Sequence, residues 1–96
     1  MASKTNRLIM IENTLFKEEL EKIPEGVRKQ VGLSWAIADK IDALLKKKGL
    51  SQKEFAHLMG KTEPEVSRWV GGTHNFTLKT LAKISVVLGE DLIKVL

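Results

Sequence analysis

The sequence predicts a folded all-α protein, and three observations support this: two indicate helices and the third indicates a folded chain. Apolar residues recur at three- and four-residue intervals from residue 34 to the end, and no part of that stretch alternates as a strand would. Helix-capping residues divide it at short, regular intervals. The composition, with 43% hydrophobic and 29% charged residues, is typical of a folded globule. We expect five helices in this part and one further helix before it.

The first helix of this part is predicted to begin at Ser34. Its apolar stripe is Ile37, Ile41, Leu44 and Leu45. Three lysines, residues 46–48, favour a helix C-terminus because they complement the negative end of the helix dipole. Gly49 supplies the left-handed residue that commonly follows.

Two capping boxes predict the next two helices. Ser51 and Glu54 stand three residues apart at the start of one helix, which we expect to end near Gly60. Thr62 and Glu65 repeat the pattern at the start of a shorter helix that the glycines at 71 and 72 end. In such a box, the hydroxyl and the carboxylate each accept a hydrogen bond from the other residue's backbone amide.

The last two predicted helices follow a loop. Thr77 is placed to cap a helix that runs to Leu88 and ends at Gly89. We interpret residues 90–96 (EDLIKVL) as a short final helix, whose apolar residues suggest a dimer surface or a last layer of the core.

The first 33 residues form a separate segment in this interpretation. Residues 14–23 (TLFKEELEKI) carry a helical apolar stripe, and we expect Pro24 and Gly26 to end it in a linker. Residues 1–10 are expected to fray. The predicted division is therefore an N-terminal segment, residues 1–33, and a helical domain, residues 34–96.

Size, charge and cysteine content limit the function. A chain of 96 residues holds one modest core and no large enclosed active site, so we do not expect an enzyme. The formal charge of +4 moderately favours an anionic partner, and ten of the sixteen Lys and Arg residues lie after residue 33. The absence of cysteine excludes disulfides and thiolate metal sites and fits a reducing cytoplasm. No apolar run is long enough for a signal peptide or a membrane span.

Residues 51–69 carry a helix-turn-helix signature. Two helices that cross at a tight turn need a small residue at the crossing and one free to adopt positive φ in the turn, and Ala56 and Gly60 meet these needs. The inward positions of the pair are apolar. They are Phe55, Met59, Val66 and Trp69.

The segment that carries this signature resembles the lambda-repressor-like (Xre/Cro-type) helix-turn-helix proteins. Residues 60–84 (GKTEPEVSRWVGGTHNFTLKTLAKI) are similar to the same region of HigA-type antitoxins, whose partner is a RelE-fold toxin. The resemblance covers residues 33–96 and implies a five-helix DNA-binding fold. It departs from the broader pattern at Lys61, where an apolar residue is common, and at Glu63 and Pro64, where polar amides are common.

The resemblance implies a set of DNA contacts at two helix starts. The side chain at position 52 contacts a backbone phosphate in the family, so Gln52 is a candidate; a solvated residue is the alternative. Thr62 is a cap and a second phosphate candidate. We predict no metal or cofactor, because the two histidines, His57 and His74, lack a third ligand.

The outward face of the third predicted helix carries the candidates for reading bases. Arg68 is placed to bind guanine or phosphate, and its alternative is an ion pair with Glu65. Pro64 lacks a donor and could contact only a thymine methyl, whereas Ser67 could contact DNA through its hydroxyl. Glu63 could accept a hydrogen bond from cytosine N4.

The loop before the next helix completes the predicted interface. In relatives this loop follows the DNA backbone, and polar residues here could donate to phosphate. For Asn75 and Thr77, purely local turn and cap bonds are the alternative. The candidates are Thr73, His74, Asn75, Thr77 and Lys79.

These features favour a transcriptional repressor that binds a palindromic operator as a homodimer. One helix contacts few base pairs, and half-sites on one face lie about 34 Å apart, so two copies are expected. The resemblance implies an antitoxin that neutralises a RelE/HigB-like mRNA endonuclease and represses its own operon, with residues 8–31 as the candidate toxin contact. That segment could instead merely extend the core. A free-standing regulator without a toxin and a protein-interaction module that no longer binds DNA are the alternatives.

Overall fold

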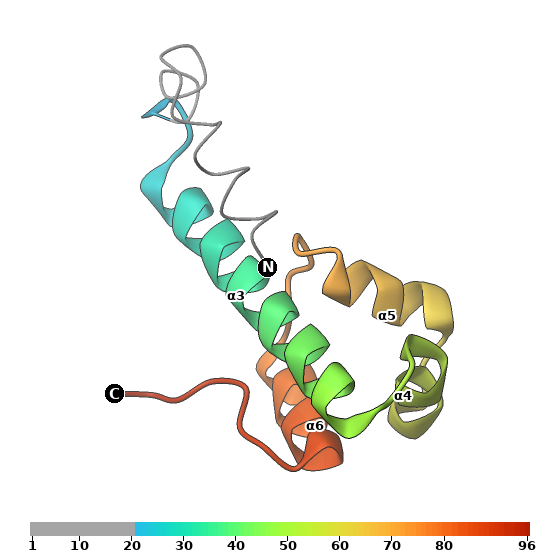
Figure 1. The fold of residues 1–96 in the computed structure, drawn as a ribbon. Helices are drawn as coiled ribbons and strands as arrows, with labels where there is room; N and C mark the ends of the chain where they lie inside the picture. The colour runs from blue at the N-terminus through green and yellow to red at the C-terminus, as the bar shows by residue number, and fades with distance from the viewer. Residues whose placement is uncertain (1–20) are drawn as a thin grey trace.

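The computed structural model describes residues 21–96, which form four helices and contain no strand. The helices are α3 (Glu25–Lys48), α4 (Gln52–Met59), α5 (Glu63–Val70) and α6 (Leu78–Leu88). Figure 1 shows the long α3 running diagonally, with the three shorter helices gathered around its C-terminal half. The all-α prediction is therefore confirmed for these residues.

A single apolar core holds the four helices together. α4 packs against α5 and α6, and α3 packs against α5. The most buried large side chains include Phe55, Ile41, Met59 and Val66. The buried cluster consists of Ile41, Leu44, Leu45, Phe55, Ala56, Met59, Val66, Trp69, Ile84 and Leu88. Every apolar residue that the helix-turn-helix signature placed inward is in this cluster.

The start of the first helix was predicted wrongly. α3 begins at Glu25, and Ser34 is a buried residue inside it, 5% exposed, and not its N-cap. Pro24 precedes the helix as expected, but Gly26 does not interrupt it. A helix tolerates single glycines at a cost of about 1 kcal/mol each, and α3 contains more than six turns over which to offset that cost. The expected linker is thus helical, and α3 passes through the division that we predicted after residue 33.

The final helix was also predicted wrongly. Residues 90–96 are not helical. Gly89 adopts φ +72° and ends α6, and seven residues are too few to nucleate a helix without strong packing. The segment is instead attached by two side chains: Ser85 Oγ accepts a hydrogen bond from the Leu92 amide at 3.2 Å, and Lys47 Nζ lies 3.2 Å from Glu90 Oε2.

Two predictions concern residues before the described part of the chain. The predicted fraying of residues 1–10 lies outside the described residues, as does nearly all of the predicted helix at 14–23. Within residues 21–96, no helix is both long and apolar enough to cross a membrane. The same residues hold no group of three His, Cys, Asp or Glu side chains arranged to bind a metal ion.

A close contact between Trp35 and Gly72 fixes the loop that follows α5 to the side of α3. Gly72 has φ +99°, and a Cβ atom built on it would lie 2.8 Å from Cδ1 and 3.0 Å from Nε1 of Trp35. Only glycine adopts this backbone without strain and leaves room for the indole ring. Trp35 is thus held by an intramolecular contact.

We expect Gly72→Ala to destabilise the protein by about 1–3 kcal/mol, because the new methyl group combines a strained φ with a clash against Trp35. Chemical denaturation monitored by circular dichroism would measure the loss. Gly71→Ala is the matched control: Gly71 has φ −68°, which alanine adopts freely, and a Cβ atom built on it would lie 3.3 Å from the Arg68 carbonyl oxygen, a tight contact but a milder one than that at Gly72. Equal losses for the two variants would contradict this account.

Candidate nucleic-acid interface

The helix-turn-helix pair, α4 and α5, has the predicted geometry at its turn. Ala56 is 2% exposed where the two helices cross, and Gly60 adopts φ +67° at the end of α4. Lys83 on α6 fixes the same point, since its Nζ donates to the Met59 carbonyl at 2.8 Å. A cation at a helix C-terminus is favourable both as a donor and by its charge. Sequence reasoning missed Lys83, because the contact joins residues 24 positions apart and no local pattern predicts it.

Both capping boxes are present. Ser51 Oγ accepts from the Glu54 amide at 3.0 Å, and the Ser51 amide donates to Glu54 at 3.1 Å. The Thr62 amide donates to Glu65 Oε2 at 2.7 Å, and the Glu65 amide donates back to Thr62 Oγ1 at 3.3 Å. These bonds satisfy backbone amides that would otherwise lack partners at the helix starts.

Glu65 is therefore held at the start of α5 by its bonds to Thr62. The Thr62 backbone amide, followed by the Thr62 hydroxyl, lowers the pKa of the Glu65 carboxyl below its ordinary value, and the positive charges of Lys61 and Arg68 add smaller effects. The Ser51 amide likewise lowers the pKa of Glu54. The carboxylate at position 65 stays ionised and keeps its orientation.

Arg68 is on the outward face of α5 and is free to meet a ligand. Val66 and Trp69, its neighbours on the inward face, are 0% and 4% exposed, whereas Ser67 and Arg68 are exposed. The alternative ion pair between Arg68 and Glu65 is not formed, and no other carboxylate among residues 21–96 holds the guanidinium. The structure thus leaves this side chain in the position expected of a base or phosphate contact.

Glu63 and Pro64 form the first turn of α5 on the same outward side. Both are exposed, and Glu63 is the first helical residue. A proline this early in a helix costs little, because the amide that it lacks would have no intrahelical partner. Glu63 is the one carboxylate of this turn that is not used by the cap.

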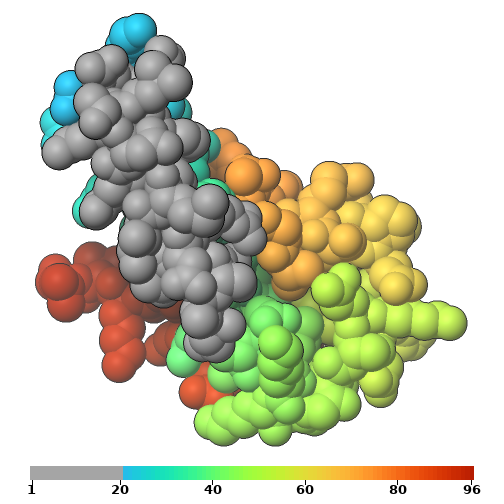
Figure 2. Space-filling model, turned by 45° about the horizontal axis from the view of Figure 1, so that its top comes forward, coloured from blue at the N-terminus to red at the C-terminus, as the bar shows by residue number. Residues whose placement is uncertain are grey.

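An open concavity joins α5 to the loop after it. It has a volume of about 480 Å³ and is lined by Arg68, Gly71, Thr73, His74 and Asn75. Four of the predicted DNA-contacting residues are thus brought together, and Gly71 is an additional lining residue. Figure 2 shows α5 and this loop, in yellow to orange, exposed together along one side of the molecule.

His74 has a packing role that the sequence did not predict. Its ring meets Phe76 edge-on at a centroid distance of 4.8 Å and lies 6.2 Å from Trp69. Trp69 in turn contacts Phe55 and Phe76, at 6.2 and 6.1 Å. The loop is consequently attached to the core through an aromatic cluster, which holds the concavity's rim in place.

The remaining predicted contacts lie outside the concavity. Thr77 caps α6, since its hydroxyl oxygen accepts from the Thr80 amide at 3.2 Å, and the hydroxyl groups of the two threonines are 3.0 Å apart. The local role predicted for Thr77 is therefore present. Gln52 is a half-buried first residue of α4, and Lys79 is exposed in the first turn of α6. Their phosphate contacts stay predictions.

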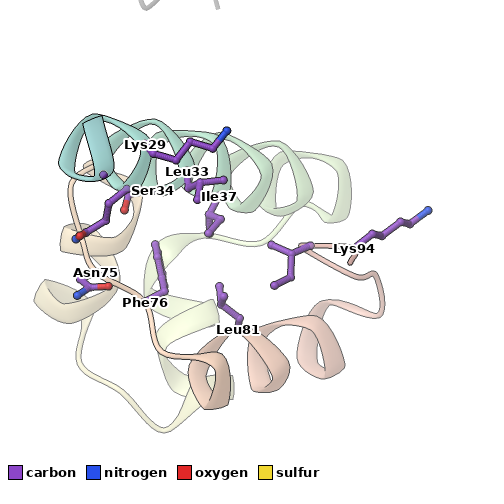
Figure 3. A pocket seen from close by; sticks show the side chains of 11 residues that line it. Lys29, Leu33, Ser34, Ile37, Asn75, Phe76, Leu81 and Lys94 are labelled. Atoms are coloured by element: carbon purple, nitrogen blue, oxygen red, sulfur yellow. The ribbon is translucent and has the colours of Figure 1, made fainter. Parts of the chain in front are cut away.

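A second cavity, of about 470 Å³, lies between the N-terminal half of α3, the loop at Phe76 and the C-terminal tail. Figure 3 shows Leu33, Ile37, Phe76 and Leu81 around it, while the charged end of Lys94 points away. The walls of this cavity are mostly apolar, although Lys29 also lies along its edge. This cavity is therefore a weaker candidate for specific binding than the surface around Arg68.

Comparison with known proteins agrees with the geometry. Residues 41–95, more than half of the chain, match the model of the helix-turn-helix family HTH_3. The chain belongs to this family, which indicates a sequence-specific DNA-binding regulator. A comparison with curated proteins and one with solved structures each gave no match.

We expect the stability contributed by the Glu65 box to depend on pH. Because the folded-state pKa is lowered, the contribution is fully present above the unfolded value of about 4.3 and is lost as the pH falls through the lower folded value. Glu65→Gln should be less stable than the parent at pH 7, and the difference should shrink below about pH 4. Urea unfolding at several pH values measures this; a difference that stays constant down to pH 3 would contradict it.

Proposed function

We propose that this protein is a transcriptional repressor that binds a palindromic operator as a homodimer. The observation that carries the proposal is the outward face of α5, where Arg68 is unpaired beside a concavity lined by Thr73, His74 and Asn75. Side chains of this kind on a helix that is fixed by its inward face are suited to contact base edges and phosphates in a major groove.

The acidic first turn of α5 favours specific over nonspecific binding. Glu65 is engaged with Thr62, so only Glu63 would face the polyanion. A free carboxylate there is unfavourable near phosphate but can accept from cytosine N4. We infer that affinity for random DNA is weak and that the preferred site places a cytosine opposite Glu63.

We further propose that the protein is the antitoxin of a type II toxin–antitoxin pair, with a RelE/HigB-like toxin as partner. The similarity of residues 60–84 to HigA-type antitoxins supports this. The exposed N-terminal half of α3 provides a surface, because Val27 and Val31 are 47% and 38% exposed and continue the apolar side of the helix beyond the core. Ile23, 38% exposed, lies just before the helix. This surface is the described part of the predicted toxin contact at residues 8–31.

The first test of DNA binding is a gel shift with the chain's own upstream promoter DNA at about 0.15 M salt, with scrambled DNA as competitor. Selective retention is expected. If scrambled DNA competes as well as promoter DNA while the protein remains folded, the result would instead support a protein-interaction module.

The toxin proposal needs a separate test. A small gene for a basic RelE-like protein beside this gene is expected, and its induction should stop growth unless this protein is co-expressed. If such a neighbouring gene is harmless, or if co-expression of this protein does not relieve its toxicity, the antitoxin proposal is wrong. The protein would then be a free-standing regulator.

We expect Arg68→Ala to weaken operator binding by about 1–3 kcal/mol and to relax selectivity at the base pair that it contacts. Lys61→Ala is the control, because Lys61 carries the same charge on an exposed position of the turn but not on the outward face of α5. Titration of both variants into labelled promoter DNA measures the difference. If the two substitutions weaken binding equally and for all sequences, Arg68 acts only through its charge.

A further inference from the structure

α6 carries an exposed apolar ridge that the core does not use. Leu78, Ala82 and Val86 follow one another at four-residue spacing, and the two large side chains are 76% and 81% exposed. These are the most exposed large apolar side chains on any helix of residues 21–96. The opposite side of α6 buries Leu81, Ile84 and Leu88 in the core. The helix therefore has a second apolar side that the domain leaves in water.

The ridge is complementary to a second copy of itself. Its centre is the small residue Ala82, with one large apolar residue four positions to each side. If two α6 helices cross antiparallel at Ala82, Leu78 of each copy meets Val86 of the other, as an isologous contact requires. The small central side chain permits the short interaxial distance of about 8 Å at the lower end of the usual range.

Charge favours the same antiparallel arrangement. α3 ends with three lysines and α5 with Arg68, but α6 has no basic residue in its last turn. In the antiparallel pair, Lys79 lies opposite that last turn in the other copy and supplies a cation to its exposed carbonyls. Lys83, the other cation on this side of α6, is held by the Met59 carbonyl.

We propose that the ridge of Leu78, Ala82 and Val86 is the two-fold contact between copies of this protein. The inference rests on the proposed homodimer and names its surface. It assigns Lys79 to the partner's helix end in place of the predicted phosphate contact. α6 packs on α4, and the ridge includes no residue of α5, so Arg68 on the outward face of α5 is not part of the contact.

Cysteine substitution tests the contact directly, because the chain has no cysteine of its own. A disulfide needs Cα atoms about 4.4–6.8 Å apart, so Ala82→Cys should cross-link to itself on mild oxidation. Lys53→Cys, at an exposed position on α4, is the control and should stay uncrosslinked. A mixture of the Leu78→Cys and Val86→Cys variants should form more cross-linked dimer than either variant does alone. This result would show that the two α6 helices run antiparallel.

Ala82→Arg provides the second measurement. Ala82 is exposed, so the monomer should keep its helical circular dichroism and thermal unfolding, while dimerisation measured by sedimentation weakens about tenfold or more. If the parent protein is a dimer that Ala82→Arg leaves intact, and Ala82→Cys does not cross-link, the proposed contact surface is wrong but the homodimer is not. A parent that stays monomeric both alone and on promoter DNA that it binds selectively would overturn this surface and the homodimer together, but not DNA binding.

Discussion

The burial of Trp69 is the constraint on which the candidate DNA surface depends. α5 has eight residues, too few for a helix to be stable alone, so its position must come from tertiary contacts. Trp69 is 4% exposed and contacts Phe55 from α4 and Phe76 from the loop. One side chain thus joins α4, α5 and the loop that follows. The outward residues of α5 inherit their orientation from this inward anchor.

Features decided within one helical turn could be predicted from the sequence, and features decided by distant contacts could not. Both capping boxes, the Thr77 cap, the left-handed glycines at 49 and 60 and the end of α6 at Gly89 are as expected, because each needs only neighbouring residues. The start of α3 and the form of residues 90–96 were predicted wrongly. Residues 25–33 are helical although all of them are exposed, and residues 90–96 are not helical although four of them are apolar, so the apolar pattern decided neither outcome.

The candidate site shows the same division. The exposure of Arg68 and Ser67 followed from the helical period, because Val66 and Trp69 had to face inward. The period could not show that Arg68 shares a concavity with the loop, or that His74 packs against Phe76. The Lys83 bond to Met59 and the packing of Trp35 on Gly72 also join distant positions. They fix the ends of the interface without appearing in any motif.

The loop between α5 and α6 is held at several points, which affects how it would bind. Gly72 lies against Trp35, His74 and Phe76 pack beside Trp69, and Thr77 closes the loop as the cap of α6. Ordering a free loop on binding would cost entropy, and a loop already ordered avoids most of that cost. Thr73 and Asn75, the exposed residues between these fixed points, can therefore meet a phosphate with little rearrangement.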